Sequence, residues 1–250
     1  MSDPALPPLN GFLVVNKPRG PSSASVTNHL KWMLKQQGYP KNIKIGHGGT
    51  LDPLAEGVLP VGIGKATKQL QQLLDGPKTY LFTVKFGTQT TTGDAEGEVT
   101  GTVAVPCLTI AAIRRASAAF VGCISQSPPP FSALKINGLR AYKLAREGHE
   151  IVLPPRQITI HAIECIDYNE RETEATFSAT VGKGTYIRTL AEDISKSLET
   201  LGYVTLLRRT QHGPFTLESA ITPEILDNAI KTGQIAAHIL PLLAVPPAGK

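Results

Sequence analysis

The stretch "GHGGTLDP", from Gly46 to Pro53, sets three glycines around one histidine and ends in an aspartate before a proline. Glycine adopts backbone angles that other residues resist, and it leaves room for a close ligand. Pro53 disfavours a helical backbone at Asp52 and favours an extended one. The stretch therefore predicts a loop that presents Asp52, although a purely structural Asp-Pro turn fits the same residues.

The composition is that of a folded protein with a modest excess of positive charge. The 250 residues are 41% hydrophobic, enough for one large domain or two small ones, and the net charge is +5. Residues 1–78 hold nine lysines and arginines against four acids, and residues 131–156 hold five against two, whereas residues 157–182 hold one against five. This segmental distribution is expected if one surface meets phosphate.

Several classes of protein lack support in the sequence. The three cysteines, Cys107, Cys123 and Cys165, are widely spaced without a zinc pattern, which favours reduced thiols and a cytoplasmic protein. The first ten residues have no apolar signal-peptide core, and no run reaches the roughly 18 apolar residues that span a membrane. "GIGKAT" has Ala66 where a Walker A motif has a hydroxyl, and no GxGxxG, HExxH or GxSxG pattern occurs.

The hydrophobic pattern mixes strands and helices without a regular βαβ rhythm. Strand patterns occur at residues 11–18, 57–64, 79–87, 158–168 and 175–184. Helical patterns occur at residues 21–38, 67–76, 108–120, 185–202 and 222–233. Pro60 predicts that its strand is irregular or lies at an edge, and the last two strands are expected to pair. The mixture predicts an α+β fold around a mixed sheet.

Residues 128–156 form a basic excursion between these elements. The segment opens with three prolines, closes with Pro154 and Pro155, and has room for a short helix around Tyr142. Long loops in domains are usually functional or disordered. We therefore expect a basic flap here.

Five blocks of the chain, in order and over roughly residues 11–215, resemble the signature of the TruB family of tRNA pseudouridine synthases. They are "GFLVVNKPRGPSS" (Gly11–Ser23), "GHGGTLDPLAEGVLPVGIGKATK" (Gly46–Lys68), "KTYLFTVKFGTQTTTGDAEG" (Lys78–Gly97), "PPPFSALKINGLRAYKLAREGHEI" (Pro128–Ile151), and "GKGTYIRTLAEDI" (Gly182–Ile194) with "LLRR" (Leu206–Arg209). The resemblance implies the pseudouridine synthase fold, with a mixed, largely antiparallel sheet flanked by helices and an RNA-binding flap. It also implies isomerisation of uridine to pseudouridine, which consumes nothing and needs no cofactor or metal.

The resemblance implies roles for individual residues. Asp52 matches the catalytic aspartate, which acts on the ribose as nucleophile or base, and Arg188 matches the ion-pair partner that keeps it charged. Tyr80 matches the tyrosine that stacks on the target base and can move a ribose proton. His47 matches the histidine that packs into the RNA loop, and Leu207 matches a leucine that lines the pocket. On the residues alone, each also fits an ordinary structural position.

The implied partner is tRNA, with the T-loop uridine at position 55 as target and the T-loop and T-stem as the recognised shape. A uridine in a folded loop must be flipped out, so phosphate contacts have to offset that cost. The candidate phosphate contacts, each of which is alternatively a solvated surface charge, are Lys17, Arg19, Lys65, Lys68, Lys135, Arg140, Lys143, Arg208 and Arg209. We expect a monomer with no membrane partner and no obligatory protein partner.

The sequence also departs from the family pattern. Many relatives carry a small C-terminal RNA-binding (PUA) domain, and the residues after "GPF" are too few for a complete one. Glu56 fills a place that often holds a small or hydroxyl residue, and a few extra residues precede "GHGG". The expected organisation is a flexible tail at 1–10, a catalytic domain at 11–233 that includes the flap at 128–156, and a short C-terminal tail at 234–250.

Two alternatives stay open at this point. One is a related synthase that acts on another RNA, such as a ribosomal RNA or a messenger RNA hairpin, including the branch that depends on guide RNA. The other is an RNA-folding chaperone in which catalysis is not essential.

Overall fold

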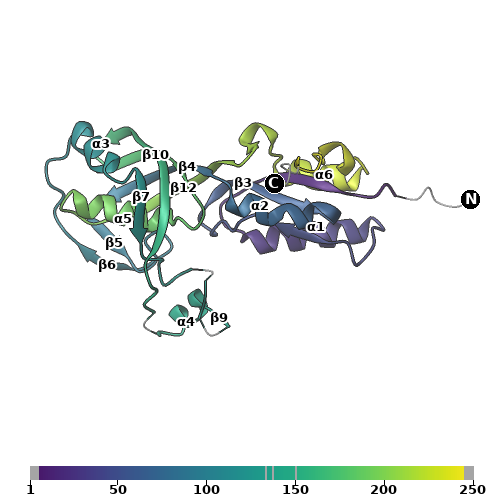
Figure 1. The fold of residues 1–250 in the computed structure, drawn as a ribbon, viewed down its shortest axis with the longest axis horizontal. Helices are drawn as coiled ribbons and strands as arrows, with labels where there is room; N and C mark the ends of the chain where they lie inside the picture. The colour runs from purple at the N-terminus through teal and green to yellow at the C-terminus, as the bar shows by residue number, and fades with distance from the viewer. Residues whose placement is uncertain (1–5, 133, 137, 150, 245–250) are drawn as a thin grey trace, which may run out of the picture. The chain divides into compact units, whose positions relative to one another are not determined.

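The chain divides into two units. The first comprises Met1–Gly76 and Arg208–Lys250, and the second comprises Pro77–Leu207. The computed structural model describes residues 6–132, 134–136, 138–149 and 151–244, without the side chains of Lys135, Arg140 and Arg146 (Figure 1). The outer parts of both predicted tails, 1–5 and 245–250, therefore lie outside the described residues.

The sheet of the first unit is built around β3 (Glu56–Ile63). β1 (Gly11–Lys17) runs antiparallel to it, from Gly11 opposite Ile63 to Lys17 opposite Gly57. β2 (Ile45–His47) pairs antiparallel with the end of β3, and the last residues of β12 (Gly202–His212) pair parallel with its start. β13 (Phe215–Thr216) continues from β12 by an antiparallel turn.

Pro60 lies inside a regular, doubly paired strand, so the prediction of an irregular or edge strand is wrong. The Pro60 carbonyl accepts a hydrogen bond from Gly48 N at 2.8 Å. The carbonyl and the amide position of one residue point to the same side of a strand. That side of β3 pairs with β12 at Glu56 and Gly57 and with β2 from Val61 onwards. The missing N–H of Pro60 falls between these short pairings, where no ladder bond is lost.

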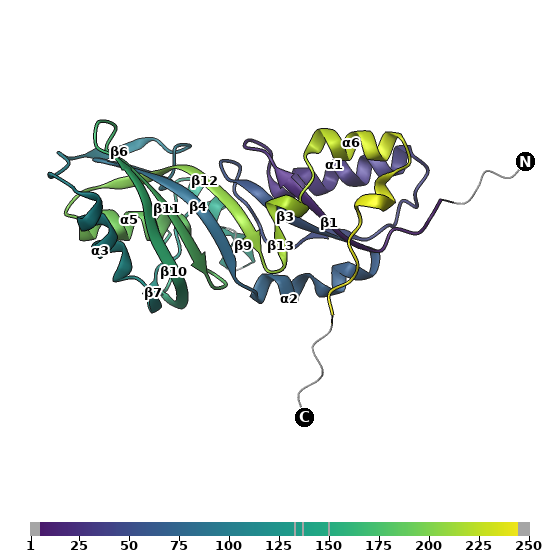
Figure 2. The same ribbon diagram turned by 90° about the horizontal axis from the view of Figure 1, so that it is seen from above.

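Helices cover both faces of this sheet (Figure 2). α1 (Ser23–Gln36) and α6 (Pro223–Lys231) lie on one face, whereas η1 (Gly64–Gln69) and α2 (Leu70–Asp75) lie on the other. The Thr222 side chain caps α6, and the following proline occupies the first turn. Both faces of β1 are therefore buried, which explains its continuous apolar run.

The segment after α6 is attached to the first unit. It contains η3 (Ile235–His238), after which Leu240 exchanges two backbone hydrogen bonds with Phe12, at 2.7 and 2.9 Å. The Leu243 backbone exchanges two more with the Gln69 side chain, at 2.9 and 3.0 Å. Leu240 and Leu243 pack on the apolar cluster around Phe12. The inner part of the predicted C-terminal tail thus belongs to the packing of this unit.

The second unit has a largely antiparallel sheet. β4 (Lys78–Phe86), β11 (Glu174–Val181), β10 (Arg156–Asn169) and β7 (Gly122–Gln126) are consecutive antiparallel neighbours, and the start of β12 lies beside β4. The expected pairing of the strands at 158–168 and 175–184 is confirmed. The Phe82 and Phe177 rings stack in the core with centroids 5.2 Å apart.

Helices and short hairpins complete the second unit. α3 (Ile110–Ala118) packs against β10, and α5 (Ile187–Ser197) packs against β4. The remaining short elements are β5 (Thr88–Thr90), β6 (Val99–Thr102), and, within the predicted flap, β8 (Lys135–Ile136), β9 (Leu139–Arg140) and α4 (Ala141–Arg146). The predicted α+β class with a mixed, mostly antiparallel sheet is confirmed. Across the described residues, no helix combines the length and apolar character needed to cross a membrane.

We expect Gly57→Ala to lower the free energy of unfolding by about 3 kcal/mol, because it combines backbone strain with overpacking. Gly57 has φ +101°, and an added Cβ would lie 2.2 Å from the Arg209 carbonyl oxygen on β12. Gly20→Ala is the matched control, since Gly20 has φ +109° but open space around it. Urea denaturation of both variants separates strain from collision, and an equal loss in the two would contradict the predicted collision.

Candidate active site

The loop that carries Asp52 connects β2 to β3 in the first unit. Its backbone is tied at both ends: Gly48 N donates to Pro60 O at 2.8 Å, and Ala55 N donates to Asp52 O at 3.0 Å. Asp52 is half-buried and follows the buried Leu51. The loop is therefore a fixed turn with one carboxylate partly open to solvent.

Ser23, the first residue of α1, fixes the residue before Asp52. Its buried hydroxyl accepts a hydrogen bond from Leu51 N at 2.8 Å and donates to Leu51 O at 3.0 Å. One side chain thus satisfies both backbone groups of Leu51, which anchors the loop to α1. Ser22 rather than Ser23 caps the helix. A serine in a run of serines gave no sequence signal for this contact.

Lys17 is fully buried beneath the loop. Its Nζ donates to the carbonyls of Pro18 at 2.9 Å, Pro21 at 2.7 Å and Pro53 at 3.4 Å. A buried ammonium needs such acceptors to offset its lost hydration. The placement does not fit the predicted phosphate contact at Lys17, because a side chain with 0% exposure has no surface for RNA.

Arg209 is buried in the same way, at 1% exposure. Its Nε donates to Val58 O at 2.8 Å and its Nη2 to Gly49 O at 3.1 Å. The guanidinium therefore joins the glycine loop to β3, and the predicted phosphate contact at Arg209 does not fit its burial either. Arg208, its neighbour in the strand, faces the other way and keeps 38% of its side chain exposed.

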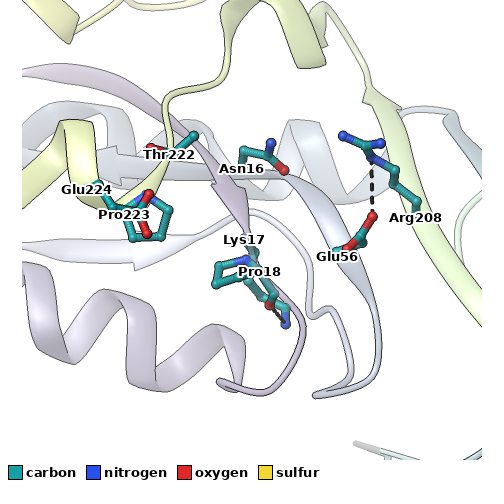
Figure 3. Close-up of a pocket in the computed structure, with 8 residues that line it drawn as sticks. All are labelled: Asn16, Lys17, Pro18, Glu56, Arg208, Thr222, Pro223 and Glu224. Atoms are coloured by element: carbon teal, nitrogen blue, oxygen red, sulfur yellow. Dashed lines mark hydrogen bonds and ion pairs between the residues drawn. The ribbon is translucent and has the colours of Figure 1, made fainter.

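Arg208 and Glu56 line a cavity of about 230 Å³ on the first unit (Figure 3). The two residues are register partners on β12 and β3, and Arg208 Nε lies 3.5 Å from Glu56 Oε1. The other lining residues are Asn16, Lys17, Pro18, Thr222, Pro223 and Glu224. The unusual acid at position 56 thus forms a cross-strand ion pair with Arg208.

His47 lies on β2, opposite Val61, and is half-buried. Burial lowers the pKa of its imidazole below the usual 6.5, and the nearby positive charge of Arg209 lowers it further, against a smaller opposite effect of the Gly49 backbone. The ring is therefore neutral at pH 7. A neutral imidazole suits packing against a nucleobase better than pairing with a phosphate.

The other predicted phosphate contacts fall into two groups, those with exposed side chains and those whose side chains are not described. Arg19, Lys65, Lys68 and Lys143 are exposed, so their contact with RNA stays a prediction. The side chains of Lys135 and Arg140 lie outside the described residues.

In the second unit, Arg188 is buried on the first turn of α5. Its Nη1 donates to Thr92 O at 2.7 Å and its Nη2 to Phe131 O at 2.9 Å, while its Nε lies 3.7 Å from Asp94 Oδ2. Asp94 is itself buried, and its Oδ1 accepts from Thr92 Oγ1 at 2.5 Å and from Glu96 N at 3.0 Å. Asp94 was not among the predicted site residues, although "TTTGDAEG" showed an acid in a tight turn.

A buried glutamine fixes the start of the helix that carries Arg188. Gln126, at the end of β7, donates to Tyr186 O at 3.1 Å and accepts from Tyr186 N at 2.8 Å. The Arg156 guanidinium lies over the Tyr186 ring, 5.1 Å from its centroid. No spacing in the sequence predicted this contact, because Gln126 and Tyr186 are 60 residues apart.

The remaining predicted site residues belong to the second unit. Tyr80 is a half-buried residue of β4, opposite Ala179 of β11, and Leu207 is a buried residue of β12. Asp52 and His47 belong to the first unit, whereas Tyr80, Arg188 and Leu207 belong to the second. The ion pair between Asp52 and Arg188 therefore stays a prediction.

The fold defines a class, that of pseudouridine synthases. The fold is similar to that of a chain in the crystal structure of a Cbf5-Nop10-Gar1 complex, with a TM-score of 0.69 and 29% identity over 92% of this chain and 60% of that one. A chain in the structure of an H/ACA RNP bound to a substrate RNA containing 2'-deoxyuridine is 27% identical, with a TM-score of 0.66, over 92% of this chain and 59% of that one.

The sequence comparisons narrow the class to one family. Residues 31–187 match the N-terminal domain of TruB family pseudouridylate synthases, and residues 188–244 match the tRNA pseudouridylate synthase B C-terminal domain. The tRNA pseudouridine synthase B of Rickettsia bellii (strain OSU 85-389) is 50% identical over 88% of this chain and 73% of its own length. That of Rickettsia felis is 48% identical over 88% of this chain and 63% of its own length. The chain belongs to the TruB family.

We expect His47 to make stability depend on pH. Because the folded pKa lies below 6.5, the unfolded chain binds a proton that the folded chain does not bind in the interval between the two values. The contribution is fully present above pH 6.5 and is lost as the pH falls through that interval. His47→Gln should remove this slope, whereas His161→Gln, which alters an exposed histidine, should not. Urea denaturation over a pH series measures it, and an unchanged slope in His47→Gln would rule the effect out.

Proposed function

We propose that this protein is a tRNA pseudouridine synthase that isomerises the T-loop uridine at position 55. Its membership of the TruB family and its relatives named tRNA pseudouridine synthase B support the reaction. The isomerisation breaks the bond from C1′ to N1 and forms one from C1′ to C5, so the base detaches, turns and reattaches. C5 loses a proton and N1 gains one, which leaves the composition unchanged. We further propose that the protein acts in the cytoplasm, on naked tRNA and as a monomer.

The observation that carries the proposal is the braced loop around Asp52. Ser23 fixes Leu51 on one side of the aspartate, Lys17 bonds to Pro53 O on the other, and Arg209 bonds to Gly49 O. Whether the carboxylate adds to C1′ or removes a ribose proton, it must be ionised and held at one place relative to the sugar. The rigid turn around the half-buried Asp52 meets the second need, because it holds the carboxylate at one place.

The partners of Arg188 support its assignment as the cation for Asp52. Two of its nitrogens already donate to fixed carbonyls, and Asp94 lies beside the third. The guanidinium is thereby oriented before any substrate binds, which lowers the reorganisation that the reaction needs. In the same proposal Tyr80 stacks on the target base and Leu207 lines its pocket.

The RNA contacts proposed around this site are fewer than the sequence predicted. His47 packs into the emptied T-loop, and Lys68 and the half-exposed Arg208 contact phosphate, with Lys135 and Arg140 of the flap 128–156 as further candidates. Lys17 and Arg209 act instead on the loop backbone.

Asp52→Asn is expected to abolish pseudouridine formation while the affinity for tRNA stays within about threefold, since the variant removes one charge at the reacting centre and no phosphate contact. The measurement is pseudouridine mapped to the nucleotide in an unmodified tRNA transcript without added proteins or guide RNA. Asp167→Asn, at an exposed aspartate of β10, is the matched control and should retain activity.

The outcomes separate the alternatives. Product at the T-loop uridine with wild type and Asp167→Asn, but not with Asp52→Asn, would support the proposed reaction, the proposed substrate and the role of Asp52 together. Tight tRNA binding without product in any variant would favour a chaperone, and product only in another RNA would favour a different target.

Asp94→Asn is expected to lower kcat by about 100-fold with little change in KM, because a small misplacement of Arg188 at a reacting centre costs about that much. Asparagine keeps an acceptor oxygen for Thr92 Oγ1 and Glu96 N, so the turn is preserved. Glu98→Gln removes the same charge from an exposed position nearby and is the control. Equal kinetics in the two variants would show that Asp94 does not orient Arg188.

A further inference from the structure

Away from the loop of Asp52, helix α1 presents an exposed indole. Trp32 is 55% exposed and is the single tryptophan of the chain. Its ring stacks on His29, with centroids 5.9 Å apart and planes at 29°. His29 Nε2 in turn lies 2.9 Å from Asp227 Oδ1 on α6. The indole thus stacks on His29 while much of its surface stays exposed to solvent.

The neighbours of Trp32 on the helix surface are polar. Asn28, Lys35 and Gln36 are exposed and stand four residues before, three after and four after it, which places them beside it on one face. We call these four residues the Trp32 stripe. The large apolar residues Leu30, Met33 and Leu34 of α1 point the other way and are buried. The stripe is therefore one aromatic ring among hydrogen-bonding groups, and not an apolar patch.

The charge around the stripe is positive. From Pro4 to Leu51 the chain carries six lysines and arginines, of which Lys17 is buried, and no aspartate or glutamate. Lys31 and Lys35 lie on α1 itself, and Lys41 and Lys44 follow it, all exposed. The facing helix α6 carries two acids, Glu224 and Asp227, and Asp227 is in contact with His29. The surface is complementary to a polyanion.

These features fit RNA better than a membrane or a protein. A membrane-binding helix needs a wide exposed apolar face, and α1 has buried its own. A protein interface centres on a contiguous apolar patch, whereas Trp32 has polar neighbours. An unpaired nucleotide needs a flat ring for its base and cations for its phosphates, and each stacked base stabilises binding substantially.

We propose that the Trp32 stripe is a second RNA contact, on which Trp32 stacks an unpaired base of the tRNA other than the uridine that is isomerised. The inference rests on the proposed function, since it takes tRNA as the partner. The lysines around the stripe neutralise the neighbouring phosphates, and the amides of Asn28 and Gln36 contact the base edges.

The single tryptophan makes the test direct. Unmodified tRNA transcript is titrated into Asp52→Asn protein while tryptophan fluorescence is followed, and binding is measured in parallel by filter retention. We expect quenching that saturates with binding. Trp32→Leu should weaken binding about tenfold, Trp32→Phe should weaken it less because a ring remains, and Ile225→Ala, at a 46% exposed apolar residue of α6, should leave it unchanged.

Three results would overturn the inference. They are saturated tRNA binding without a change in fluorescence, wild-type affinity in Trp32→Leu, and a fluorescence change that follows protein concentration without RNA and marks contact between two copies. Pseudouridine formation by the wild-type protein in the same transcript separates the two proposals. If product forms but the fluorescence of Trp32 does not change on tRNA binding, this inference alone is contradicted. If the fluorescence is quenched but no product forms, the RNA contact is supported and the proposed activity is contradicted.

Discussion

The candidate site depends on a buried guanidinium. Arg209 donates hydrogen bonds to two backbone carbonyls, Gly49 O in the glycine loop and Val58 O in the adjoining strand. A buried cation without acceptors is costly, so the loop and β3 can keep this arrangement only while both carbonyls stay in place. The interaction thus fixes the loop from inside, and Lys17 fixes it from the far side through Pro53 O.

The glycines of the loop follow from this constraint. Gly49 has φ +112°, and an added Cβ there would lie 3.0 Å from the His212 ring and 3.5 Å from Arg209 Nη1. The backbone must turn its carbonyl inward and leave room for the two side chains, which a residue with a Cβ does poorly. Pro53 then stiffens the chain after Asp52. The loop therefore packs its backbone around the Arg209 guanidinium and leaves the Asp52 carboxylate partly exposed to solvent.

Local pattern predicted much of this molecule and failed where burial was decided by distant segments. The strand at 79–87 and the helix at 222–233 follow from short spacings and were predicted correctly. Lys17 and Arg209 looked like surface cations, because their partners are backbone carbonyls, which any sequence can supply. The two carbonyls that Arg209 meets also lie 151 and 160 residues away. The prediction from Pro60 was wrong for a related reason. A proline is tolerated at this position of β3 because the pairings with β12 and β2 stop on either side of it.

The side chains proposed to react were easier to predict from the sequence than the groups that hold them in place. A charged residue that meets a substrate stands in a distinctive local sequence, as Asp52 does, but the groups that orient it are often backbone atoms or single polar side chains. Arg188 illustrates this: its motif was recognised, while Asp94, Thr92 O and Phe131 O were found only in the structure. All three lie in the same unit as Arg188. These three contacts therefore orient the arginine from within its own unit.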